Sequence, residues 1–90
     1  MQLKKIRSEI DSIDKKLIML LFERIKKVRK VAEYKKKNRI PILDKEREKE
    51  IILSKKKAAK KIGISERYAE DIFKRIIKES HSAEKMIIKK

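Results

Sequence analysis

The sequence predicts an all-α protein with three helices, long, medium and long, in a single domain of residues 1–90. The chain contains one Gly and one Pro, so few positions favour turns. Its apolar residues recur every three or four positions, as in a helix that buries one face, and no segment alternates as a strand does. Charged residues make up 48% of the chain, but this apolar period predicts a folded helical bundle rather than disorder.

The first predicted helix extends from about Leu3 to about Lys37, because no Gly or Pro interrupts its apolar period. Pro41 disfavours helical dihedral angles at Ile40, so we expect the helix to end near Asn38. Its apolar residues follow the spacing of a bundle seam: Leu3, Ile6, Ile10, Ile13, Leu17, Leu20, Leu21, Val28 and Val31.

The second and third helices have clear end signals in the sequence. Asp44 is the expected N-cap of a helix from about Lys45 to Lys61, and Gly63 is its expected C-terminal stop. Ser65 is expected to cap the third helix, which continues into the terminal lysines. The predicted order is therefore a long helix, a loop, a medium helix, a tight turn and a long helix.

The length of the first helix predicts a homodimer. Its 35 residues would span about 52 Å, whereas a compact domain of this size has a radius of gyration of only about 12 Å. Such a helix extends beyond any monomeric globule and leaves part of its apolar stripe in water. We therefore expect a second copy to pair with it across a twofold axis, with a long monomeric hairpin as the alternative.

Polar residues occupy seam positions that would otherwise be apolar. Five of them lie on the predicted seams: Arg24 and Lys35 in the first helix, Glu48 in the second, and Ser80 and Glu84 in the third. Burying ionised groups costs several kcal/mol each unless they find partners. We therefore expect these residues to line a polar pocket that is rich in cations and binds an anion.

Taken singly, each of these residues has an ordinary explanation. Arg24 could extend past the seam into water, and Asp44 could be only a helix cap. Arg47 and Glu48 could form a surface ion pair, and Lys35 lies in a lysine-rich run. Their joint order favours the pocket, because Arg24 and Lys35 are 11 residues apart and so share one helix face.

The composition limits the classes of partner. The formal charge of +15, from 29 basic and 14 acidic residues, favours anions in general, whether nucleic acid, acidic membrane or small metabolite. The chain has no Cys and one His, so we expect neither a disulfide nor a metal site. The longest apolar run, Leu17 to Phe22, is too short to span a bilayer or to form a signal-peptide core. We expect a cytoplasmic protein without a membrane partner.

The order of these residues resembles the all-helical chorismate mutases, especially the small monofunctional three-helix dimers. The resemblance extends over nearly the whole chain, and its most specific parts are the Ile-Asp-x-Ile-Asp stretch and the segment from Arg39 to Glu48. The matching segments are Ile6-Arg7, Ile10 to Leu17, Leu20 to Arg24, Val28 to Lys35, Ile40 to Glu48, and the third-helix residues Tyr68, Phe73, Ile76, Ile77 and Ser80.

The resemblance implies an intertwined homodimer with two active sites that converts chorismate to prephenate, on the route to phenylalanine and tyrosine. This Claisen rearrangement is one concerted step, so we expect no nucleophile, metal or cofactor. Catalysis then consists of holding a flexible dianion in its reactive conformation and stabilising the charge that develops on the ether oxygen.

The resemblance also implies how the substrate carboxylates are bound. Arg24 and Ser80 would hold a carboxylate, joined by Arg7 from the other subunit, and Arg47 would support this network. Arginine suits this task because its planar guanidinium can pair bidentately with a carboxylate.

The remaining implied contacts are to the ether oxygen and the ring hydroxyl. Lys35 would bind the ether oxygen and a carboxylate, while Asp44, largely through its backbone N–H, and Glu48 would hold the hydroxyl. Glu84 departs from the commonest bacterial pattern, which has Gln as the second donor to the ether oxygen, although some members, including fungal enzymes, similarly use Glu. Since only a protonated carboxyl donates a hydrogen bond, we expect turnover to rise as the medium becomes more acidic. The expected catalytic residues are Lys35, Glu84 and Arg24.

Three other functions compete with this interpretation. Elimination of pyruvate from isochorismate on the same fold would use the same arginines and a loop lysine. The positive charge favours a helical nucleic-acid-binding protein, but aromatic residues for stacking are few and no helix-turn-helix spacing is evident. A plain coiled-coil module would not explain charges on the seams. We therefore expect a chorismate mutase that binds no nucleic acid.

Overall fold

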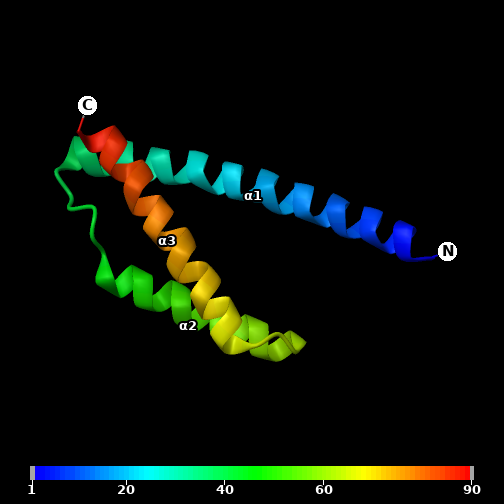
Figure 1. Ribbon diagram of the computed structural model, residues 1–90. Coiled ribbons are helices and arrows are strands. Elements are labelled where there is room, and N and C mark those ends of the chain that lie inside the picture. The colour runs from blue at the N-terminus through cyan, green and yellow to red at the C-terminus, as the bar shows by residue number, and fades with distance from the viewer. Residues whose placement is uncertain (1, 90) are drawn as a thin grey trace.

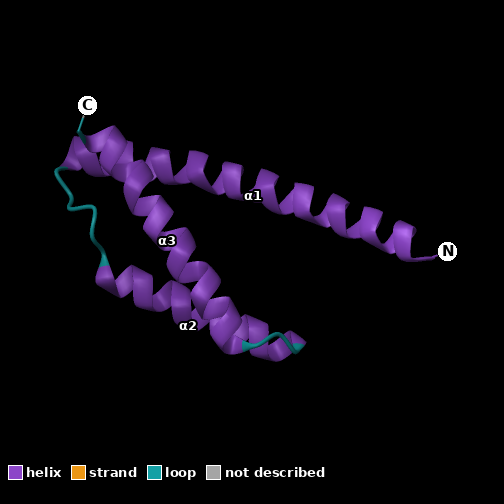
Figure 2. Ribbon diagram, viewed as in Figure 1, coloured by secondary structure: helices purple, strands orange, loops and turns teal. Residues whose placement is uncertain are grey.

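The structure is a computed structural model that describes residues 2–89, and its three helices lie in the order long, medium, long (Figure 1). They are α1 (Gln2–Asn38), α2 (Lys45–Ile62) and α3 (Glu66–Ile88). The described part of the chain contains no strand, so only loops join the helices (Figure 2). The all-α prediction is confirmed, and each predicted helix end lies within a residue or so of the observed one.

The C-terminus of α1 is closed by a Schellman motif. The Ile40 N–H donates to the Lys35 carbonyl at 2.8 Å, and the Arg39 N–H donates to the Lys36 carbonyl at 3.4 Å. Arg39 takes the left-handed conformation that this motif requires, with φ of 54°. The predicted end at Asn38 is confirmed, but the left-handed position is filled by an arginine rather than by the usual Gly or Asn.

The caps of α2 and α3 also follow the sequence signals. Asp44 Oδ1 accepts from the Arg47 N–H at 3.0 Å, and Ser65 Oγ accepts from the Tyr68 N–H at 3.2 Å. Gly63 is left-handed, with φ of 86°, at the end of α2. All three predicted signals are confirmed, and α3 continues to Ile88, next to the terminal lysines.

α3 packs against both α1 and α2 and so holds the three helices together. Figure 1 shows that α3 runs back from the turn after α2 to the C-terminal part of α1, while the N-terminal half of α1 extends away on its own. The described chain is correspondingly elongated, with extents of 57 × 26 × 14 Å. Its radius of gyration of 16.4 Å exceeds the value of about 12 Å for a compact domain of this size.

The core of one chain is small. Its buried apolar residues, within the described range, are Ala32, Ala59, Ala69 and Ile77. Two polar residues, Ser80 and Glu84, are buried beside them. The apolar stripe on the projecting half of α1 is roughly half exposed, at Leu3, Ile6, Ile10, Ile13 and Leu17. No helix in residues 2–89 is long and apolar enough to cross a membrane.

Candidate functional site

A cavity of about 170 Å³ lies where the C-terminal part of α1, the start of α2 and the C-terminal part of α3 meet. Its apolar wall is formed by Val28, Val31, Ile42, Ile51 and Ile77. Seven of the eight residues predicted for the site line it: Arg24, Lys35, Asp44, Arg47, Glu48, Ser80 and Glu84. Residues from all three helices are therefore brought together at one position, as the polar seam positions predicted.

Arg24 and Ser80 connect α1 to α3 in this cavity. The Arg24 Nη1 group donates a hydrogen bond to Ser80 Oγ, across 56 residues of sequence. Ser80 Oγ in turn donates to the Ile76 carbonyl at 3.0 Å, which fixes the direction of its hydroxyl hydrogen. Arg24 therefore points into the cavity, and the alternative in which it extends away from the seam into water is wrong.

Lys35 and Glu84 form the second connection between the same two helices. The Lys35 Nζ donates to Glu84 Oε2 at 3.0 Å and to the Ile42 carbonyl at 2.9 Å. The two side chains are only 14% and 8% exposed, so water screens this ion pair weakly. The Ile42 carbonyl, which sequence reasoning missed, ties the loop before α2 to the same ammonium group.

Two cations of the cavity, Arg24 and Arg47, lie close enough to repel each other, although the carboxylates of Asp44, Glu48 and Glu84 line the same cavity. Burial lowers the pKa of the Arg24 guanidinium, and the nearby positive charge of Arg47 lowers it further. An arginine stays charged despite such a shift, so the two guanidinium groups repel one another across the site. This arrangement favours an anionic ligand, whose carboxylates would relieve the repulsion.

The residues at the start of α2 are less buried than those of α1 and α3. Arg47 lines the cavity, but its Nη1 pairs with the carboxylate of Glu50, so the alternative of a surface ion pair between Arg47 and Glu48 is wrong. Asp44 is exposed, and its carboxylate caps α2 through the Arg47 N–H.

Glu48 faces His81, a cavity residue that sequence reasoning considered only as a metal ligand. The distance from His81 Nε2 to Glu48 Oε2 is 3.7 Å, and Glu48 Oε2 is buried without a hydrogen-bond partner. One signal could have identified His81: it directly follows Ser80 and precedes Glu84 by three residues, so it lies on the same face of α3.

Arg7 is the predicted site residue that lies elsewhere. It is exposed on the projecting half of α1, where it lines a surface hollow with Leu3, Lys4, Ser8 and Asp11. Arg7 precedes Arg24 by 17 residues, which corresponds to about 25 Å along the helix. Within one chain, Arg7 therefore cannot reach the cavity.

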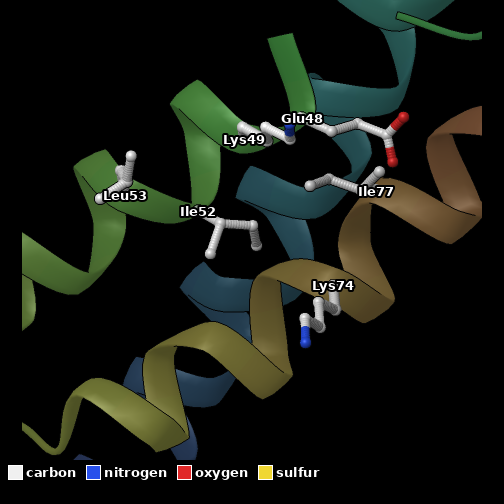
Figure 3. A pocket seen from close by; sticks show the side chains of 6 residues that line it. All are labelled: Glu48, Lys49, Ile52, Leu53, Lys74 and Ile77. Atoms are coloured by element: carbon white, nitrogen blue, oxygen red, sulfur yellow. The ribbon is translucent and has the colours of Figure 1, made fainter. Parts of the chain in front are cut away.

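A second, apolar hollow of about 410 Å³ lies between α2 and α3 and shares Glu48 and Ile77 with the site. Figure 3 shows Ile52 and Leu53 on α2 and Lys74 on α3 around it, while the Glu48 carboxylate points away from Ile52 and Leu53. Glu48 thus forms part of the boundary between an apolar groove and the polar cavity.

Comparison with known proteins relates most of the chain to one family. A family model described as chorismate mutase type II matches residues 6–85. A protein named chorismate mutase from Methanocaldococcus jannaschii is 36% identical over 87 residues, which cover 97% of this chain and 88% of that protein.

Other relatives are much longer. The T-protein of Haemophilus influenzae is 39% identical over 82 residues, covering 91% of this chain and 22% of that protein. A bifunctional chorismate mutase/prephenate dehydratase of Buchnera aphidicola is 40% identical over 84 residues, which cover 93% of this chain and 22% of that protein. The chain therefore spans about a fifth of the length of the first curated relatives that it matches. No solved structure matches it.

Proposed function

The chain belongs to the chorismate mutase type II family, and from that premise we propose that it is an isomerase that converts chorismate to prephenate in aromatic amino acid biosynthesis. The proposed domain is the whole of residues 1–90, and the proposed location is the cytoplasm.

The observation that carries this proposal is the convergence of Arg24, Lys35 and Arg47 on one cavity. Burial and the nearby positive charge of Arg47 lower the pKa of the Arg24 guanidinium, so a cation is held at an unfavourable position in this cavity. A small dianion such as chorismate would neutralise these charges and accept hydrogen bonds from them. An uncharged ligand would leave the repulsion in place.

The rearrangement itself asks little of the protein beyond positioning and charge. The ether C–O bond breaks while a C–C bond forms within the same molecule, and no atom is transferred to the enzyme. Arg24 and Ser80 would fix a carboxylate, which reduces the entropy lost in reaching the transition state. Lys35 would donate a hydrogen bond to the ether oxygen as negative charge develops on it. Glu84, which accepts from Lys35 in the structure, would add a second hydrogen bond in its protonated form.

The hydroxyl end of the substrate would lie against α2. Glu48 would accept a hydrogen bond from the ring hydroxyl, with the Asp44 backbone N–H beside it, and Arg47 would support the carboxylates. The position of Glu48 in the cavity lining, with its carboxylate turned away from Ile52 and Leu53, supports this assignment.

We propose that the active enzyme is an intertwined homodimer in which Arg7 enters the cavity of the other subunit. The half-exposed apolar stripe on α1 supports a second copy, since a stripe of this length is rarely left in water. The small cavity also supports it, because about 170 Å³ is below the 300–1,000 Å³ that is usual for ligand pockets.

The direct test is an ultraviolet assay of chorismate loss at two pH values, with product identified as prephenate. Isochorismate is the control substrate, because the same fold could eliminate pyruvate from it. We expect chorismate to be consumed faster at the lower pH and isochorismate to remain unchanged. Release of pyruvate from isochorismate, with no loss of chorismate, would overturn the proposal.

The shared site is tested by mixing two inactive variants, Arg7→Ala and Arg24→Ala, after unfolding and refolding them together. A mixed dimer would contain one site with both arginines and one site with neither. Random pairing makes half of the dimers mixed, so about one quarter of the wild-type sites should be restored. If the mixture stays inactive although mixed dimers form, Arg7 does not act across the subunit boundary.

A further inference from the structure

Within the site, we propose that His81 is a positioning residue that holds the Glu48 carboxylate in place for the ring hydroxyl of the substrate. The inference rests on the proposed function, which assigns Glu48 to that hydroxyl. It adds a residue from α3 that does not touch the reacting atoms and acts through a side chain of α2.

The first argument is the unmet acceptor. Glu48 Oε2 is buried and lacks a hydrogen-bond partner, and leaving such an oxygen without a donor is costly. His81 Nε2 lies 3.7 Å from it, about half an ångström beyond the usual limit for a hydrogen bond. A small rotation of either side chain brings a proton on Nε2 to this oxygen.

The second argument is that the other cationic groups of the cavity are already engaged. Lys35 donates to Glu84 and to the Ile42 carbonyl. Arg24 donates to Ser80, and Arg47 pairs with Glu50. Among the side-chain donors of the cavity, the imidazole of His81 is therefore the one best placed to reach Glu48 Oε2.

The third argument is the direction of the Glu48 side chain. Figure 3 shows its carboxylate turned away from Ile52 and Leu53, the apolar residues of the neighbouring groove. His81 is three-quarters buried on the cavity side. With one oxygen held by His81, the other oxygen would have a fixed direction toward the ligand hydroxyl.

The enzymatic test compares His81→Leu, which removes the donor, with His81→Gln, which keeps an N–H group at a similar reach. For chorismate, we expect His81→Leu to raise KM about tenfold with little change in kcat, because hydroxyl binding is common to ground and transition states. His81→Gln should recover most of this loss. Ser82→Ala is the matched control on α3, and its hydroxyl only bonds the exposed Lys78 carbonyl.

A substrate analogue separates positioning from general damage to the fold. For a chorismate analogue that lacks the ring hydroxyl, His81→Leu should have almost no effect on KM, because the hydroxyl contact is already absent. An equal loss with both substrates would overturn the inference, and so would a wild-type KM in His81→Leu with chorismate.

A spectroscopic test does not depend on turnover. The chain has one His, so its imidazole gives a single pair of side-chain ¹⁵N signals that need no further assignment. We expect the Nε2 signal to shift when Glu48 is replaced in Glu48→Gln and to stay unchanged in Ser82→Ala. Unchanged signals in Glu48→Gln would overturn the contact, whereas failure of the proposed function alone would appear as a wild-type protein that does not consume chorismate.

Discussion

Replacing Arg24 by Met should separate the chemistry of the site from the stability of the fold. Methionine keeps much of the length and apolar contact of the arginine stem but removes the guanidinium. The variant loses the hydrogen bond to Ser80, worth about 1.5–3 kcal/mol at most for a charged donor. Ser80 keeps its bond to the Ile76 carbonyl, so no buried hydroxyl is left unpaired.

An opposing effect reduces this loss. The lowered pKa of Arg24 means that burial and the charge of Arg47 both disfavour the cation in the folded protein. Removing the cation relieves both the cost of burying it and its repulsion by Arg47. We therefore expect the free energy of unfolding to change by no more than about 1 kcal/mol in either direction. Turnover of chorismate should fall at least about 10²- to 10³-fold, as when one preorganised donor is removed from an active site.

The measurement is urea unfolding followed by circular dichroism, together with the absorbance assay, at one fixed protomer concentration because an oligomer's stability depends on it. Arg29→Met is the matched control on the exposed face of α1 and should retain both stability and turnover. Destabilisation of Arg24→Met by more than about 2 kcal/mol would identify Arg24 as a structural residue. Normal turnover would remove it from the site.

Three further predictions concern Glu84, Gly63 and Glu70. Glu84→Gln should retain turnover, because an amide N–H donates a hydrogen bond to the ether oxygen without the proton that a carboxyl group needs; the absorbance assay with chorismate checks this, and an inactive variant would contradict it. Gly63→Ala should lower the free energy of unfolding by about 1–2 kcal/mol, because φ of 86° strains any residue with a Cβ although the space around it is open; unchanged urea unfolding would refute this. Hydrogen bonds from Lys74, and then from Lys56, lower the pKa of Glu70, so its contribution to stability is present above the unfolded pKa and is lost as pH falls through the folded one. Glu70→Gln should therefore be less stable than the wild type at pH 7 and equal to it in strong acid, and a stability difference that persists in acid would contradict this.

The helices and the faces that they present follow from local sequence signals. The caps at Asp44 and Ser65 and the stop at Gly63 depend on contacts within a few residues, which the local sequence specifies. The helical period likewise predicted which polar side chains lie on the seams. The family resemblance then supplied roles for those side chains, which remain predictions.

Which of these side chains meet depends on how the helices pack against one another. The pairing of Lys35 with Glu84, 49 residues away, depends on how α3 crosses α1, and helical period carries no information about that crossing. The same packing brings His81 to Glu48, a contact between two helices that neither helix specifies alone. The exposure of the apolar stripe on α1, by contrast, was predicted from the sequence. A single straight helix of this length extends beyond the core of one chain, so that core cannot bury the whole stripe.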